Sequence, residues 1–393
     1  MERRAWVILA ALLLGRIGFG YEYQAVASLG PGLIARLHLN YARFGSLIGV
    51  YMLSGAFVAL PLGLLGRRFG DRTVLGIGLA LMAAGQVVCA LAPGAQTIAL
   101  GRFVSGFGAV AMMVLQSKVI ADWFSGPRFM LAISLSSAAY PVGVGLSQLV
   151  MPLLAARFGW GAAFGSGAVE AAAALLLFLA SFRPPPGMPA PARGFTFPSR
   201  REVGLSVVAG VIWTAYTGCY AAFLSYAPTL MSARGEGLAL IGLTVSVATW
   251  GNVVATPTGG VLANRWGAPM VFALGAAAMV LGTVLMGAAD LPVLSAAIVG
   301  LPGSLHAGII IALGTLSARA ENRPAAMGIF FTIYYAGGAL TPALCGLAAD
   351  AWGGASGAMF AGAAIGAIAV PAYLLHRALG GRETQPAPAS GVV

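Results

Sequence analysis

A turn rich in glycine and arginine occurs twice in this chain, about half its length apart. The first copy spans Gly63–Arg72, and a weaker copy spans Gly260–Gly267. Each copy closes a hairpin between two apolar segments. A repeat of this period inside an almost wholly apolar chain predicts two related halves, each a bundle of membrane helices.

The composition excludes a soluble globular protein. Hydrophobic residues make up 59% of the chain and charged residues only 8%, whereas a soluble domain carries roughly 25% charged residues. The formal net charge of +11 comes from arginines in short turns, with no basic tract or arm that would indicate nucleic-acid binding. We therefore expect these charges to set the topology and to bind membrane lipids.

A helix needs about 20 mostly apolar residues to cross roughly 30 Å of hydrocarbon, and the chain divides into about twelve such segments. We expect an uncleaved first span, because Arg16 interrupts an apolar run that otherwise imitates a secretory signal. The predicted spans are Trp6–Ala27, Phe44–Leu65, Val74–Ala92, Thr97–Ala121, Phe129–Pro152, Trp160–Phe182, Val203–Tyr226, Leu238–Leu262, Met270–Ala288, Pro292–Ser317, Met327–Ala349 and Ser356–Leu375. The fold class is thus an all-α membrane protein with two pseudo-symmetric six-helix halves.

The distribution of arginine predicts the orientation. With both termini in the cytoplasm, the inner loops hold roughly fifteen basic residues and the outer loops four. An odd number of spans would destroy this bias. The outer four are Arg36, Arg43, Arg157 and Arg234.

These patterns divide the chain into four parts. Residues 1–182 form the first half and residues 203–378 the second. Residues 183–202 form a cytoplasmic linker, because its dense prolines favour an extended spacer. The Pro- and Ala-rich segment 379–393 is predicted to be a disordered cytoplasmic tail.

Three features together resemble the major facilitator superfamily: the two six-span halves, the Gly63–Arg72 turn with its echo, and Arg102-Phe-Val-Ser-Gly106-Phe-Gly108 in the fourth span. The resemblance covers essentially the whole chain. It implies a transporter whose two halves rock about a central site. Four further stretches are similar to the cyanate-permease-like branch of small-anion and organic-acid carriers: Tyr23–Pro31, Leu47–Tyr51, Lys118–Phe124 and Phe331–Gly337.

The repeated turn departs from the superfamily pattern. An acidic residue is usual where Arg67 stands, a basic one where Asp71 stands, and the second half has Asn264 in place of the acid. The resemblance implies a cytoplasmic latch at this turn, and we expect Asp71 to pair with a neighbouring arginine. An exposed pair of this kind would be worth about 0–1 kcal/mol. The candidate gating residues are Arg67, Arg68, Asp71, Asp122, Arg128, Asn264 and Arg265.

Basic residues inside the spans are candidates for substrate binding, because an unpartnered ion there costs at least about 2.5–3.5 kcal/mol. Arg16 shares a helical face with Gly20 and Tyr23, and its guanidinium could clamp an anion or form a structural pair. Arg102 could bind substrate or position helices. Lys118 could release an anion inward or extend to the cytoplasmic interface.

Three ionisable groups are candidates for proton coupling. Glu22 and Glu170 lie within spans, where a carboxyl could load and unload a proton, although Glu170 could instead pair with an arginine. His306 in the tenth span could carry a proton or be a satisfied core residue.

Aromatic hydroxyls at helical spacing in the seventh and eleventh spans suit a wet pocket, or alternatively pack the bundle. Further candidate substrate-binding residues are Tyr23, Tyr140, Tyr220, Asn252 and Tyr335.

The chain has no nucleophile and base motif, no metal-ligand spacing and no phosphate-binding loop after a strand, so we predict neither an enzyme nor a cofactor. The leading hypothesis is a monomeric transporter of a small anion or monocarboxylate in the bacterial inner membrane, driven by protons or by exchange. Two alternatives are proton-driven efflux of amphipathic compounds and a membrane sensor that has lost transport.

Overall fold

The computed structural model describes residues 2–183, 198–319 and 322–380, with the side chains of residues 2–3, 60, 63–67, 127 and 130 excepted. The predicted linker and tail therefore lie largely outside the described residues. The elements are α1 (Glu2–Ser28), α2 (Gly30–Leu37), α3 (Tyr41–Phe69), α4 (Asp71–Ala90), α5 (Ala95–Trp123), α6 (Gly126–Phe158), α7 (Trp160–Ser181), α8 (Arg200–Ala233), α9 (Leu238–Trp266), α10 (Ala268–Ala288), α11 (Pro292–Gly300), the 3₁₀ turn η1 (Pro302–Ser304), α12 (Ala307–Leu316), α13 (Arg323–Trp352), α14 (Ser356–Ala367) and α15 (Ala369–Ala378).

The prediction of an all-helical membrane protein is confirmed. In the described part of the chain, twelve helical segments are long and apolar enough to cross a membrane. Ten of the predicted spans correspond to single long helices. The short helix α2, between the first and second spans, was not predicted.

Two spans are interrupted rather than continuous. The predicted tenth span, Pro292–Ser317, breaks into α11, η1 and α12, because Pro302 has no backbone N–H to continue the helix. The twelfth span divides at Ile368 into α14 and α15. Pro371 explains this break, because it has no N–H to donate to the carbonyl of Ala367, four residues earlier.

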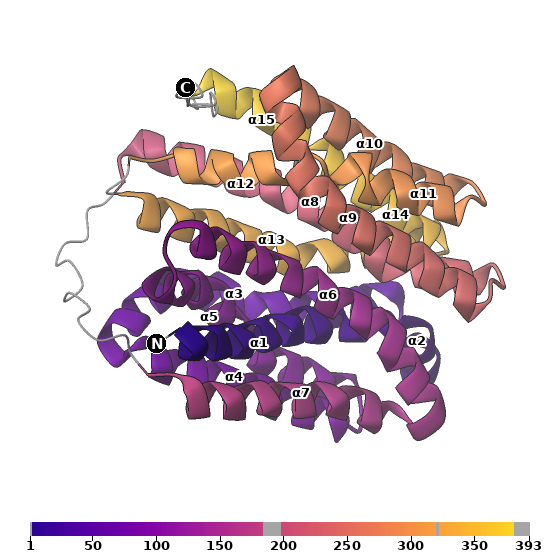
Figure 1. Cartoon of the computed structure of the whole chain (residues 1–393). Helices are drawn as coiled ribbons and strands as arrows, with labels where there is room; N and C mark the ends of the chain where they lie inside the picture. Colours follow the sequence, from indigo (N-terminus) through magenta and orange to yellow (C-terminus); the bar gives the residue numbers. More distant parts are fainter. Residues whose placement is uncertain (1, 184–197, 320–321, 381–393) are drawn as a thin grey trace.

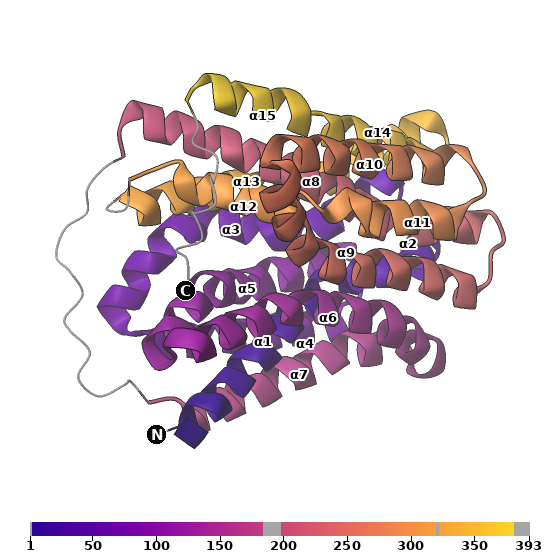
Figure 2. The ribbon, with the colours of Figure 1, turned by 45° about the horizontal axis from the view of Figure 1, so that its top comes forward.

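The helices form two halves packed against each other, α1–α7 and α8–α15 (Figures 1 and 2). The start of α1 and the end of α15 lie at one end of the bundle, with the end of α7 and the start of α8 (Figure 1). We call this end the terminal side. The opposite end holds α2 and the α8–α9 turn, and we call it the distal side.

Close contact between the halves runs along α3 and α13. A Cβ built on Gly45 would lie 2.0 Å from the Pro342 carbonyl oxygen, and one on Gly49 would lie 2.0 Å from that of Ala339. Glycine is therefore required at both positions for the two backbones to approach this closely. On the neighbouring helices, Gln24 Nε2 donates to the Leu224 carbonyl at 3.3 Å. These contacts close the distal side.

Candidate functional site

Arg16 lies within α1 and forms no ion pair with any residue that the structure describes. Its Nη1 donates to Met113 Sδ at 2.7 Å, and its buried Nε has no partner. The guanidinium carbon lies 5.4 Å from the centre of the Phe19 ring and 5.7 Å from that of Tyr140. Aromatic faces stabilise a cation by about 0.5–2 kcal/mol, which leaves the charge short of a counter-ion. An anion could supply that counter-ion.

Tyrosines of the first half line the same region. The rings of Tyr23 and Tyr140 are 6.5 Å apart, and the Phe19 ring lies 4.9 Å from that of Tyr140. Tyr23 also approaches Tyr51, with ring centres 6.1 Å apart. The structure therefore brings together the predicted residues Arg16, Tyr23 and Tyr140, and adds Phe19 and Met113.

Tyrosines of the second half also lie around Arg16. Tyr334 and Tyr335 of α13, whose ring centres are 5.0 Å apart, both lie near Arg16. The buried hydroxyl of Tyr335 has no partner. Tyr220 of α8 lies in the same region as Tyr140, across the interface, and its hydroxyl donates to the Ala248 carbonyl at 3.3 Å.

The carboxyls of Glu22 and Glu170 are neighbours inside the first half. Glu22 is fully buried, and its Oε2 accepts a hydrogen bond from the Tyr51 hydroxyl at 3.2 Å. Glu170 of α7 packs on Gly18, one helical turn before Glu22, so closely that a Cβ on Gly18 would lie 2.0 Å from Glu170 Oε2. The two carboxyls interact electrostatically. Carboxyls that interact in this way can share a proton.

Gln86 of α4 lies beside Glu22 and faces α7, where a Cβ on Gly167 would lie 3.2 Å from its Oε1. Its side chain is fully buried, and neither amide atom has a geometrically acceptable hydrogen-bond partner. Glu22 Oε1 and both oxygens of Glu170 are also buried without partners. Such a group of orphaned atoms is the setting in which a proton or water is held.

Arg102 is fully buried and bonded to main-chain oxygens. Its Nε and Nη2 donate to Leu47 and Ile48 of α3 at 2.6 and 3.2 Å, and its Nη1 and Nη2 donate to Glu22 and Tyr23 of α1 at 2.9 and 3.0 Å. Of the two roles predicted for Arg102, this geometry favours helix positioning over substrate binding.

Three polar groups of the second half, Asn252, Tyr216 and Ser304, bond to one another, whereas His306 Nδ1 is buried without a partner. The two N–H groups of Asn252 Nδ2 are matched by Tyr216 Oη at 2.7 Å and Ser304 Oγ at 2.9 Å, which fixes the interrupted tenth span to α8 and α9. His306 follows at the start of α12, edge-on to the rings of Tyr216 and Phe272 at 4.9 and 5.2 Å. His306 is almost fully buried and lies in the other half from the Glu22 and Glu170 pair.

On the terminal side, Asp71 pairs with a lysine, which was not expected from the sequence. Lys118 forms an ion pair with Asp71 and a second one, at 3.6 Å, with Asp122. Its ammonium group can reach Asp71 because both the end of α5 and the start of α4 lie on this side. The Lys118 side chain is 44% exposed, so this lysine lies at the surface rather than beside Arg16.

The other gating candidates also lie on the terminal side. The side chain of Arg67 is outside the described residues. Arg68 is exposed and lies over the Phe69 ring, 5.4 Å from its centre. Arg128 lies at the start of α6, and Asn264 and Arg265 are exposed at the end of α9.

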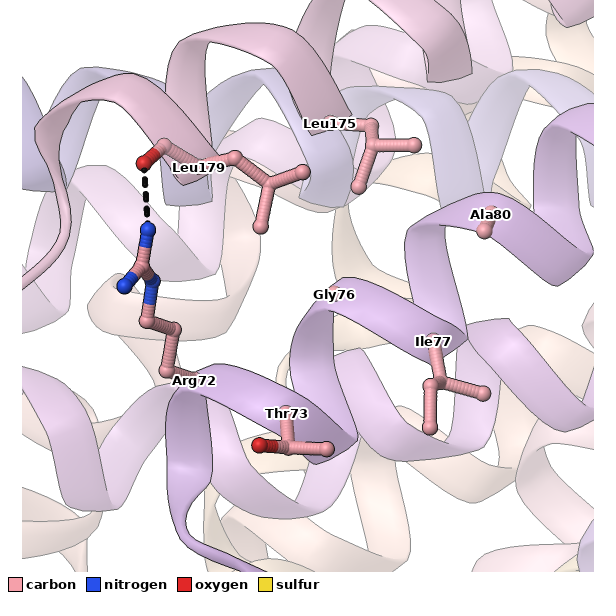
Figure 3. Close-up of a pocket in the computed structure, with 7 residues that line it drawn as sticks. All are labelled: Arg72, Thr73, Gly76, Ile77, Ala80, Leu175 and Leu179. Carbon is pink, nitrogen blue, oxygen red and sulfur yellow. Dashed lines mark hydrogen bonds between the residues drawn. The ribbon is translucent and has the colours of Figure 1, made fainter.

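An open groove of about 440 Å³ lies between α4 and α7 on the outside of the bundle (Figure 3). Ile77, Leu175 and Leu179 line it, and Arg72 Nη2 donates to the Leu179 carbonyl at 3.0 Å across its end. An apolar surface of this kind suits lipid chains, and the groove contains none of the predicted substrate residues.

Sequence reasoning missed Met113, Gln86 and the Tyr216 and Ser304 bonds of Asn252. Gln86 could have been found, because a carboxamide in an otherwise apolar span needs partners. Met113 gave no signal, since its role depends on which helix faces Arg16.

Two comparisons place this geometry among known proteins. The family model described as Major Facilitator Superfamily matches residues 12–240 and 208–391. Among solved structures, the inward-open xylose transporter XylE of Escherichia coli superposes with a TM-score of 0.78, at 16% identity, over 97% of each chain.

Curated relatives match over shorter stretches. The inner membrane transport protein YajR of Escherichia coli is 28% identical over 45% of this chain and 38% of its own length. The multidrug efflux pump LfrA of Mycolicibacterium smegmatis is 30% identical over 41% of this chain and 32% of its own length. The gallate transporter of Pseudomonas putida is 24% identical over 39% and 34%. The matched part of the chain thus spans about a third of the length of these relatives.

Proposed function

Because the chain belongs to the Major Facilitator Superfamily, we propose that it is a secondary transporter that carries a small anion or monocarboxylate by alternating access. The observation that carries this proposal is the guanidinium of Arg16, which is enclosed by aromatic rings and has no carboxylate partner in the described chain. A planar guanidinium binds a carboxylate or oxyanion through two parallel N–H bonds.

The tyrosines around Arg16 would supply the rest of the binding site. The orphaned hydroxyl of Tyr335 and the ring of Tyr140 approach the guanidinium from different halves, so an anion held there would contact both. Two stretches similar to the cyanate-permease-like branch, Tyr23–Pro31 and Phe331–Gly337, contribute residues to this region. Similarity to a gallate transporter also supports an organic anion.

We propose that the Glu22 and Glu170 pair couples transport to protons. The pair is buried beside Gln86, and Glu22 lies one to two turns along α1 from Arg16. A proton on this pair would change the net charge near Arg16 as the anion binds and leaves. His306, surrounded by rings of the second half, is a weaker candidate for this role.

The closed distal side suits an inward-facing state if the termini are cytoplasmic. From the arginine distribution we propose that both termini are cytoplasmic. We also propose that the protein is a monomer in the bacterial inner membrane. In a variant without the native cysteines, a cysteine at Ser199 should react with a membrane-impermeant thiol reagent only after the cells are opened. Labelling in intact cells would place position 199 outside the cell and would contradict the proposed orientation.

Thermal-shift screening of the purified protein against small oxyanions, monocarboxylates and amphiphiles tests the substrate class. A stabilising anion whose effect is lost in Arg16→Ala would support the proposal. Stabilisation by amphiphiles alone would refute it.

Similarity to the multidrug efflux pump LfrA and the aromatic lining of the site favour a second candidate, export of amphipathic compounds. An unpaired arginine opposes cationic substrates because it would repel them. The screen above separates the two candidates.

A further inference from the structure

A carboxylate of the second half caps a helix of the first half on the distal side. Tyr41 N and Ala42 N, at the start of α3, donate to Asp350 Oδ1 and Oδ2 of α13 at 2.8 and 3.0 Å. The first N–H groups of a helix have no acceptor within the helix. Asn40 Oδ1 accepts the next one, from Arg43 N, at 2.9 Å. One half therefore completes the N-terminal cap of the other.

This cap exists only while the two helix ends are in contact. The Tyr226 hydroxyl contacts the carbonyl oxygens of Pro342 and Tyr41 at 2.7 and 3.2 Å. A Cβ on Gly346 would lie 2.1 Å from the Tyr41 carbonyl oxygen. Separation of the halves on the distal side would break both Asp350 bonds together, and would expose the positive end of the α3 dipole without its anion.

The terminal side has a different arrangement. Its paired carboxylates, Asp71 and Asp122, bind Lys118 within the first half. Rocking of the two halves would leave that triad intact, because all three residues move together. Asp350, by contrast, crosses the interface.

We propose that Asp350 is a distal latch, a positioning residue that biases the chain toward the state closed on the distal side. The inference rests on the alternating access of the proposed function, but does not depend on the identity of the substrate. Loss of one side-chain cap should raise the ratio of distal-open to distal-closed molecules about five- to tenfold.

The test measures this ratio directly, without transport. Spin labels on Arg157→Cys of α6 and Leu238→Cys of α9, in full-length protein with Cys89, Cys219 and Cys345 replaced by alanine, report the distal separation of the halves by pulsed electron resonance. Asp350→Ala should increase the long-distance population. Asp350→Asn keeps the shape and one acceptor oxygen, and should shift the population less in the same direction.

Asp290→Asn is the matched control, because it removes the same charge from an exposed distal loop of the second half without crossing the interface. It should leave the distances unchanged. Distance distributions for both Asp350 variants that match the wild type, or a shift equally large in Asp290→Asn, would overturn the latch. Failure to bind any anion would refute the proposed function while leaving these distances interpretable.

Discussion

The two halves of the molecule share a helical plan but treat charge differently inside the membrane. The first half holds ionisable groups on continuous helices, whereas the second uses hydroxyl, amide and imidazole groups on helices that include two interrupted spans. The groups of the first half are Arg16, Glu22, Arg102 and Glu170; those of the second are Tyr216, Asn252, Ser304 and His306.

This contrast indicates which polar groups take part in function and which support the fold. A charge inside the membrane is expensive, and Arg16, Glu22 and Glu170 retain orphaned atoms. Asn252, Tyr216 and Ser304 bond to one another, as expected of residues that fix a helix break. We therefore expect substrate and proton chemistry in the first half, and a neutral wall in the second.

The largest expected effect comes from the buried carboxyls. Glu22→Gln or Glu170→Gln should abolish accumulation driven by an inward proton gradient, because an amide cannot exchange that proton. Substrate counterflow in proteoliposomes should persist, since it needs only the loaded carrier to reorient. His306→Ala should keep gradient-driven accumulation. Full accumulation in all three variants would refute coupling through a side-chain proton.

Arg16→Ala should weaken anion binding at least about tenfold, because truncating one partner of a buried charge pair typically costs 2 kcal/mol or more. Arg16→Lys should restore little of the affinity, since lysine lacks the planar guanidinium that binds an anion through two N–H bonds. Calorimetric titration of the purified variants measures both. Wild-type affinity in a well-folded Arg16→Ala protein would reduce this arginine to a structural residue.

Gly49→Val should shift the population toward the distal-open state about tenfold, since overpacking typically costs 1–3 kcal/mol and the added Cβ would meet the Ala339 carbonyl. The Arg157 and Leu238 label pair detects the shift. Gly308→Ala is the control in the second half, where the nearest atom to a new Cβ is 3.5 Å away. If Gly49→Val and Gly308→Ala gave the same distance distributions, the close contact between α3 and α13 at Gly49 would not control the opening of the distal side.

Asn252→Ala should have the smallest effect on binding, a change of less than about threefold, because both N–H groups of its amide are already bonded within the protein. It should nevertheless destabilise the second half by about 1–3 kcal/mol through the unsatisfied Tyr216 and Ser304 groups. Thermal unfolding and titration on the same sample separate the two effects. A large loss of affinity with normal stability would place Asn252 in the substrate site.

The spans were predictable from sequence because apolar length alone determines which segments cross a bilayer. The break at Gly300–His306 was not predicted, since hydropathy is the same for a continuous and an interrupted helix. The available signal was Pro302, with Gly300 and Gly303 close to it in the sequence. A proline in a span indicates a break only if neighbouring groups satisfy the freed backbone.

The candidate site was predicted only in part. Depth in the membrane was sufficient to single out Arg16, Glu22 and Glu170, but their partners depend on helix packing. Arg102 and Lys118 illustrate this limit, because the sequence placed both basic groups in one span. In the structure, carbonyls of α1 and α3 surround Arg102, whereas carboxylates on the terminal side bind Lys118.

Charge selectivity tests the central claim most directly. Binding of an anion found in the screen is compared with binding of its neutral amide, in the wild type and in Arg16→Ala. We predict that the wild type binds the anion at least about tenfold more tightly than the amide. In Arg16→Ala the ratio of the two affinities should fall close to one, because the guanidinium is the partner of the anion's charge. Equal binding of anion and amide by the wild type, or a preference that survives in Arg16→Ala, would contradict the account.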